Sequence, residues 1–226
     1  MNKNKSVQIV IYLIIAIIID ALGNALTVSL NLGSAFWTAS AVNLSHLTHI
    51  DLQSILIIYG IIVIIINVIF LKKIEPRRIF NNFLFMIPFS LLVGYTTKFF
   101  NLFHINHLNL FIRIFLDFIG IIMIAAAISI LQRVNILLHP NDDLMQIIRF
   151  KFFKGRASIA MWVSFIPPII ISLICFVITK KIYAINIGTI FSLLFQGSII
   201  GISDRVVFPQ LKHRKLSKIQ IVSKRF

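Results

Sequence analysis

The sequence predicts an all-α membrane protein with six transmembrane helices, arranged as two inverted three-helix repeats. The prediction rests on the composition, on the length of the apolar segments and on the placement of basic residues between them. Of the 226 residues, 58% are hydrophobic, and the mean hydropathy is +0.95. Soluble domains have roughly 45–50% apolar residues. The segments are continuously apolar rather than alternating, which favours membrane helices over barrel strands.

Six apolar segments are long enough to cross a bilayer, whose ~30 Å core needs about 20 helical residues. They are Val7–Leu30, Leu52–Leu71, Phe80–Phe99, Leu108–Leu131, Ile159–Thr179 and Gly188–Val207. The first segment follows Lys3 and Lys5, as in a signal peptide. It is too long for one, and no small-residue cleavage site ends it. We therefore interpret it as an uncleaved first helix.

Two breaks interrupt the apolar pattern, at Leu32–Ala39 and at Leu137–Leu144. The second contains a proline, an asparagine and two adjacent aspartates. Short stretches follow the breaks, Ala35–Leu47 and Asp142–Phe152, and each is too short to span a membrane. We expect each to form a half-helix, a surface helix or a re-entrant element.

The basic residues predict the orientation in the membrane. They cluster after the second, fourth and sixth segments: Lys72, Lys73, Arg77 and Arg78; Arg133, Arg149, Lys151, Lys154 and Arg156; Lys212, Arg214, Lys215, Lys218, Lys224 and Arg225. Because cytoplasmic loops carry the excess of Lys and Arg, both termini are predicted to be cytoplasmic. The membrane thus accounts for the net charge of +15, and no nucleic-acid partner is predicted. The Ile, Asn and Lys bias favours a bacterial cytoplasmic membrane.

A repeat is indicated by the order of the segments and by one short identity. Lys72-Lys73-Ile74 recurs as Lys180-Lys181-Ile182. We divide the chain into a first repeat, 1–105, a second repeat, 106–210, and a basic cytoplasmic tail, 211–226. Each repeat has three spans, so the second is inverted, which places the second lysine pair on the outer side. Inverted repeats are typical of secondary transporters, with the site near their interface.

Three short motifs carry a family resemblance. They are Leu32-Gly33-x-x-Phe36-Trp37-Thr38, His139-Pro140-Asn141-Asp142-Asp143-Leu144-Met145 and Ile187-Gly188-Thr189-Ile190-Phe191. Their order resembles the YczE/YyaS/YitT family of bacterial membrane proteins over nearly the whole chain. This sequence has Phe36, Thr38 and His139 where that family usually has proline, aspartate and glycine. The resemblance implies a fold rather than an activity, with an acidic role kept only in the second motif.

Polar residues of the first segment form one candidate site. Asp20, Asn24 and Thr27 share a helix face because they are three or four positions apart. A carboxylate at the bilayer centre costs at least ~2.5–3.5 kcal/mol, so it should face the protein or a wet cavity. This polar stripe either contacts a solute or coupling ion, or forms an interhelical hydrogen-bond network.

A second candidate site follows Pro140. Asn141 can cap a helix that begins there, and Asp142 and Asp143 suit its positive end. The alternative is that one of these carboxylates binds a proton or cation. Gln196, in the sixth segment, is a further candidate for lining the path. We expect these residues to share a substrate or coupling-ion site with the polar stripe.

Other residues are expected to serve structure. Arg113 and Asp117, four positions apart, are predicted to form a structural ion pair. Asp204 and Arg205 are predicted to form a local interfacial pair. Trp37 is expected at the membrane interface, or else as a cover over a site.

Two features predict helix geometry. The Pro167-Pro168 pair predicts a kink in the fifth segment, because proline removes a backbone donor. The spacing of Gly197 and Gly201 predicts close helix packing.

No enzyme class is indicated. The six histidines are scattered without metal-ligand spacing, and no nucleophile–base motif, phosphate loop or cofactor fingerprint is present. The sequence predicts no metal and no cofactor. The leading hypothesis is a small secondary transporter or permease of unknown solute, in which Asp20 or Asp142 exchanges a proton or cation. The alternative is a non-transporting membrane partner, either a substrate-capture subunit or an accessory protein of a larger complex. A homo-oligomer and another membrane subunit both remain open as partners.

Overall fold

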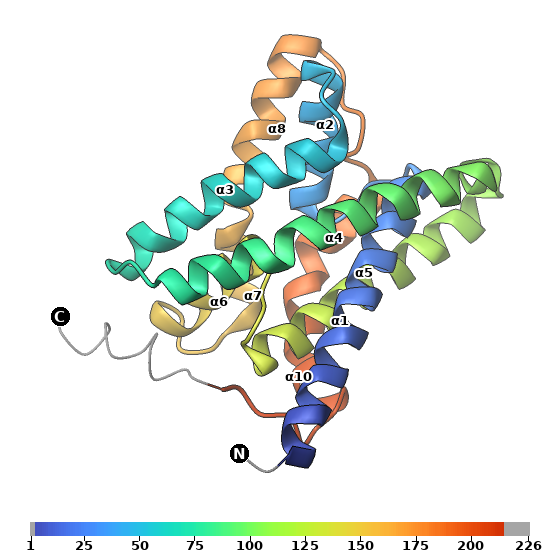
Figure 1. Ribbon diagram of the computed structural model, residues 1–226. Helices are drawn as coiled ribbons and strands as arrows, with labels where there is room; N and C mark the ends of the chain where they lie inside the picture. The colour runs from blue at the N-terminus through green and yellow to red at the C-terminus, as the bar shows by residue number, and fades with distance from the viewer. Residues whose placement is uncertain (1–2, 215–226) are drawn as a thin grey trace.

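The computed structural model describes residues 3–214, and all regular elements in this range are helical (Figure 1). Most of the predicted basic tail lies outside the described residues. Six helical segments here are long and apolar enough to cross a membrane: Val7–Leu30 within α1 (Lys3–Leu30), α3 (Leu52–Leu71), α4 (Pro76–Leu102), α5 (Leu110–Val134), Ala157–Thr179 and Ile187–Val206. The prediction of six long apolar helices is confirmed. The chain is a multi-pass membrane protein.

The last two spans are interrupted. The fifth consists of α7 (Ala157–Ser164) and α8 (Ile166–Thr179), which meet at Phe165. The interruption falls beside Pro167 and Pro168, because neither residue has an N–H to continue the helical ladder. The sixth consists of α9 (Ile187–Phe191), a π-helical turn η2 (Ser192–Gln196) and α10 (Gly197–Val206). Such turns occur frequently at functional sites.

Both short stretches after the breaks form helices inside the bundle. They are α2 (Phe36–Thr48) and α6 (Pro140–Lys151). Their first turns are buried, and in α6 most side chains as far as Arg149 are buried. The surface-helix alternative is therefore wrong for both. α2 packs against α8 and α3, whereas α6 packs against α3 and α7.

Helices α1 and α5 form the most extensive helix pair and lie side by side in Figure 1. Their backbones approach closely at Gly23 and Gly120. A Cβ atom at Gly23 would lie 2.8 Å from the Gly120 carbonyl oxygen. α4 packs on the outside of α1, and α10 packs on α5. Small residues at this crossing thus let the two helices pack closely along their apolar faces.

Each break lies against the start of a distant helix. The Leu32 carbonyl accepts a hydrogen bond of 2.9 Å from the Gly188 N–H of α9. The Leu138 carbonyl accepts one of 2.9 Å from Asn82 Nδ2 of α4. Gly33 has φ +104°, and a Cβ there would lie 2.5 Å from Thr189 Oγ1. Glycine is therefore required at the first break for both conformation and space.

Candidate functional site

A cavity of about 50 Å³ lies in the middle of the bundle, where both breaks meet α1. We call it the central cavity. Its polar lining consists of Asp20, Asn24, Trp37, Thr38, His139, Asn141, Asp142, Ser164 and Gln196. Its apolar lining consists of Ala35, Leu56, Phe89, Ile124, Ile128, Met145, Met161 and Phe165. Among the described residues, no Lys or Arg belongs to this lining, so none of them neutralises its carboxylates directly.

The polar stripe of α1 forms one wall of the central cavity. Asn24 Nδ2 donates to Asp20 Oδ1 at 3.0 Å and to the Asp20 carbonyl at 2.9 Å. The Asn24 amide oxygen accepts from Thr38 Oγ1 at 2.7 Å. Asn24 is thereby fixed in orientation and joins α1 to α2. Asp20 is held with one carboxylate oxygen on this amide, while its side chain borders the cavity.

The start of α6 forms another part of the cavity wall. The expectation that Asn141 caps this helix is wrong, because His139 is the capping residue. Its Nδ1 accepts from the Asn141 N–H at 3.3 Å, so the proton of the neutral ring resides on Nε2. Burial lowers the pKa of His139 to about 3, which keeps the ring neutral. The Nε2 atom is buried without a hydrogen-bond partner among the described residues.

The two adjacent aspartates have different environments. Asp143 is fully buried and accepts hydrogen bonds from Arg78 of α4, including one of 2.8 Å from Nε to Oδ2. Asp142 lies instead at the central cavity, and no described residue donates a hydrogen bond to its carboxylate. Burial, followed by the charge of Asp143, raises the pKa of Asp142 to about 7. Asp142 can therefore take up or release a proton near neutral pH.

Asp20 and Asp142 reach one cavity from different parts of the chain. Two carboxylates in a poorly solvated site repel each other, so ionising the first disfavours ionising the second. Their titration therefore belongs to the pair. A proton or a cation in the cavity removes this repulsion. The arrangement can bind either one and exchange them.

Three further polar side chains complete the lining. Trp37 is buried, with its ring edge-on to Tyr59, and its Nε1 has no partner among the described residues. Of the two expectations for Trp37, the position over a site fits this location. Asn141 Oδ1 is likewise buried and unpartnered. In the π-helical turn, Gln196 Oε1 accepts from Ser192 Oγ at 2.6 Å, which directs this side chain inward.

The structure brings together four of the six residues predicted for the site, Asp20, Asn24, Asp142 and Gln196. Thr27 does not line the cavity: its methyl group packs on Gly120 and its hydroxyl donates to the Asn24 carbonyl at 3.0 Å. Asp143 does not line the cavity either, because its carboxylate accepts hydrogen bonds from Arg78. Thr38 and Ser164 line the cavity although no sequence pattern singled them out as site residues. Trp37, His139 and Asn141 line it too; the sequence offered the membrane interface or a cover over a site for Trp37, and a capping role for Asn141. All but Ser164 lie within the two breaks, so the breaks themselves were the available signal.

The predicted pair of Arg113 and Asp117 does not form a direct contact within the described residues. Arg113 instead donates from Nη2 to the Leu30 carbonyl at 2.6 Å, and so satisfies the C-terminal end of α1. Both carboxylate oxygens of Asp117 are buried, and no residue in the described part of the chain donates a hydrogen bond to them. A Cβ at Gly188 would collide with this carboxylate. Asp117 thus packs against the first turn of α9, where the helix dipole favours an acidic group.

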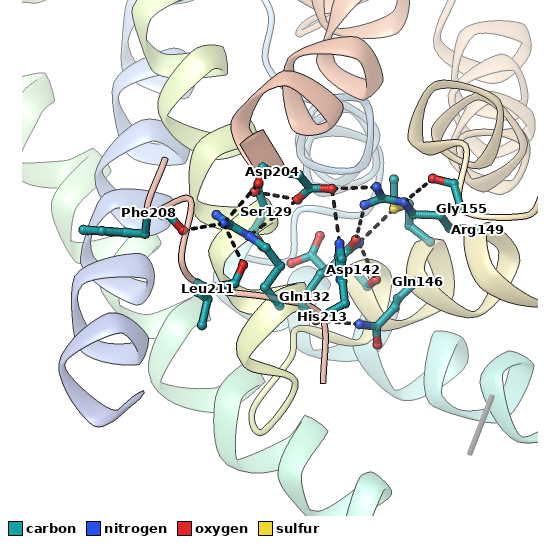
Figure 2. Close-up of polar contacts among 12 residues, drawn as sticks. Ser129, Gln132, Asp142, Gln146, Arg149, Gly155, Asp204, Phe208, Leu211 and His213 are labelled. Carbon is teal, nitrogen blue, oxygen red and sulfur yellow. Dashed lines mark hydrogen bonds and ion pairs between the residues drawn. The ribbon is translucent and has the colours of Figure 1, made fainter. Parts of the chain in front are cut away.

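A polar network lies beside α6 at the end of the bundle that holds the C-terminal segment (Figure 2). Asp204 accepts hydrogen bonds from Arg149 Nη2 at 2.6 Å and from Ser129 Oγ at 2.8 Å, and His213 Nε2 lies 3.2 Å away. The predicted local pair with Arg205 is therefore wrong. Buried Arg133 lies 3.6 Å from Asp204. Asp204 is thus the acidic centre of the network.

This network reaches both the C-terminal segment and the central cavity. Arg133 Nη1 donates to the carbonyls of Phe208 and Leu211 at 3.1 and 3.2 Å. Arg149 Nη1 donates to Gln132 Oε1 at 3.1 Å, and Gln132 Nε2 contacts the sulfur of Met145 at 2.8 Å. Met145 lines the cavity. The network therefore ties α5, α6 and α10 together directly behind the cavity.

No group of three or more His, Cys, Asp and Glu side chains suited to a metal ion occurs in the described part of the chain. The family described as a family of unknown function (DUF6198) matches residues 7–205, which span all six long helices and the central cavity. The chain belongs to this family. The match does not confirm the resemblance to the YczE/YyaS/YitT family that the motifs suggest. No curated protein and no solved structure matches the chain.

Proposed function

We propose that this membrane protein is a small secondary transporter, with the central cavity as the site of its solute or coupling ion. The observation that carries the proposal is the cavity itself. It brings two carboxyl groups, Asp20 and Asp142, together at interrupted helices in the middle of an apolar bundle. Charged groups inside membrane proteins are costly and typically mark ion or substrate pathways. Binding sites of secondary transporters lie at such interrupted helices.

The proposal includes two inverted repeats, 1–105 and 106–210. The packing of helices supports it, because each helix contact in one half has an equivalent contact when the two halves are interchanged. α1 packs on α4 as α5 packs on α10, and α2 packs on α8 as α6 packs on α3. Each break also contacts the start of the last span of the opposite half.

Backbone conformation supports the same repeat. Eight described non-glycine residues have positive φ, a conformation that is uncommon for such residues. They occur at corresponding helix ends of the two halves: Asn31 and Asn135, His49 and Lys154, Lys72 and Lys180, His104 and Phe208.

The mechanism in this proposal is an exchange of exposure around a fixed site. Asp20 belongs to the first half and Asp142 to the second, so a rocking motion of the halves changes the environment of both carboxyl groups. A proton or cation bound between them is released when one half moves away from the other. Each half would thus contribute one of the two groups that couple ion binding to solute movement.

The membrane setting is also part of the proposal. The basic residues place both termini on the cytoplasmic side under the positive-inside rule. The polar network around Asp204 then lies at the cytoplasmic end, and the composition favours a bacterial cytoplasmic membrane.

Flux into proteoliposomes tests the proposal. Purified protein is reconstituted and assayed with a panel of small charged and neutral solutes, with and without a pH gradient. We expect uptake of at least one solute class that depends on the gradient and is lost in Asp20→Asn. Asp51→Asn is the matched control, because Asp51 is an exposed helix cap that asparagine can replace. Absence of flux for every class, with an ATPase pair that co-purifies, would support the substrate-capture alternative instead.

A further inference from the structure

We propose that the central cavity binds a small organic monocation that carries several N–H donors, of the size of guanidinium or methylammonium. This inference rests on the proposed function, since it names the class of solute for the same site. It follows from the charge, the hydrogen-bonding groups and the size of the lining.

The charge of the lining selects a cation. Within residues 3–214, Asp20 and Asp142 are the acidic groups that line the cavity, and no basic residue of this range lines it. His139 is kept neutral by burial. Because the two carboxyl groups disfavour double ionisation, the site favours a state with a single negative charge when one of them is ionised. A monocation neutralises this charge, whereas an anion is repelled and a dication leaves an excess of positive charge.

The hydrogen-bonding groups favour a cation with N–H donors over a bare metal ion. Acceptors border the cavity from both halves, with the carboxyl group of Asp20 from the first half and that of Asp142 from the second. N–H donors on the solute can hydrogen-bond to both of these groups. Trp37 and His139 are neutral, so they add no positive charge to the lining.

The volume and the rings set the size and shape. A water molecule needs about 10–15 Å³ of cavity volume. A cavity of about 50 Å³ therefore accommodates a solute of only a few non-hydrogen atoms. The apolar walls include the rings of Phe89 and Phe165 and the sulfur atoms of Met145 and Met161. Aromatic faces attract organic cations. A flat or compact cation therefore fits better than a strongly hydrated alkali ion.

Protons should compete with this cation. The ionisable groups that face Asp142 are Asp20 from α1, His139 at the start of α6 and the adjacent Asp143, whose charge is paired with Arg78 of α4. α3, α5, α7 and the π-helical turn present only non-ionisable side chains to the cavity. Since the pKa of Asp142 is raised to about 7, acid fills the site with a proton. We expect an apparent affinity about tenfold weaker at pH 6 than at pH 8.

Binding to purified protein in detergent tests the inference without any requirement for flux. Millimolar guanidinium chloride, methylammonium chloride, sodium chloride and urea are compared by calorimetry and by the shift in melting temperature. Urea matches guanidinium in size and shape but lacks its charge. We expect saturable binding of guanidinium or methylammonium that weakens at pH 6 and is absent for urea. Asp20→Asn and Asp142→Asn should abolish it, and Asp51→Asn should not.

The outcomes distinguish between classes of solute and separate binding from transport. Equal binding of urea would overturn the inference in favour of a neutral polar solute, and equal binding of sodium would overturn it in favour of an inorganic ion. These comparisons use the unaltered protein, so they hold even if a variant fails to fold. Binding of an organic cation without flux in proteoliposomes would support the site and contradict transport. Flux of another solute class without such binding would support transport and contradict the site chemistry.

Discussion

Asp142 and Asp143 are consecutive residues with different roles in the structure. Asp143 neutralises Arg78 in the interior, whereas Asp142 borders the central cavity. The sequence could not assign these roles, because both residues stand in the first turn of one helix and either side chain suits its dipole. The difference arises from which neighbouring helix each side chain faces. A substitution at one position should therefore not mimic the same substitution at the other.

Asp143→Asn should strongly destabilise the protein. The change leaves the Arg78 guanidinium, only 18% exposed, without its charged partner. Removing one member of a buried ion pair typically costs about 3–5 kcal/mol. Thermal unfolding in detergent should show a large decrease in melting temperature. In the double variant with Arg78→Gln, much of the loss should be recovered; a double variant as unstable as Asp143→Asn would contradict this account of the pair.

Asp142→Asn should change how stability depends on pH. In the wild type the pKa of Asp142 is raised to about 7 from an ordinary value of 3.8. The folded protein then holds a proton that the unfolded chain has released, so stability decreases as pH rises from about 4 to 7. The full effect is at most about 4 kcal/mol. Melting curves at pH 5 and pH 8 should differ less in Asp142→Asn than in the wild type, and an unchanged difference would contradict the raised pKa.

At the scale of elements, hydropathy alone located all six long helices, because crossing a bilayer requires a length that composition reveals. The interruption of the fifth span beside Pro167 and Pro168 was equally accessible, since proline acts locally. The π-helical turn at Ser192–Gln196 was not, because no residue type in it requires that geometry. The expectation of a cap at Asn141 fails for a similar reason: side-chain preference favours asparagine, but the cap is His139, two residues earlier.

The two glycines of the last span should respond differently to substitution. A Cβ at Gly197 would lie 2.7 Å from the Ser158 Cα of α7, whereas one at Gly201 would meet only the Ala157 methyl group at 4.0 Å. The predicted close packing is therefore carried by Gly197 alone. Gly197→Ala should lower stability by about 1–3 kcal/mol through overpacking. Gly201→Ala, the matched control, should be neutral or slightly stabilising because alanine is the better helix former.

At the scale of the whole molecule, the proposed inversion explains a pair of lysines that the charge pattern alone does not. Lys72 and Lys180 both follow the end of a long helix in the left-handed conformation. Under the positive-inside rule the first belongs on the cytoplasmic side, and the second is an exception. In an inverted repeat the two positions are equivalent and lie on opposite faces. The outer position of Lys180 then follows from the inverted repeat.

Cysteine labelling from one side of the membrane tests this arrangement. In a Cys175→Ser background, Lys154→Cys and Lys181→Cys place single thiols at exposed positions. We expect a membrane-impermeant maleimide applied to intact cells to modify Lys181→Cys but not Lys154→Cys. Asn106→Cys, in the exposed loop between α4 and α5, serves as the outer-side control. After permeabilisation all three should react. Labelling of Lys154→Cys in intact cells, or protection of Lys181→Cys there, would place α8 in the other direction and contradict the inversion of the two halves.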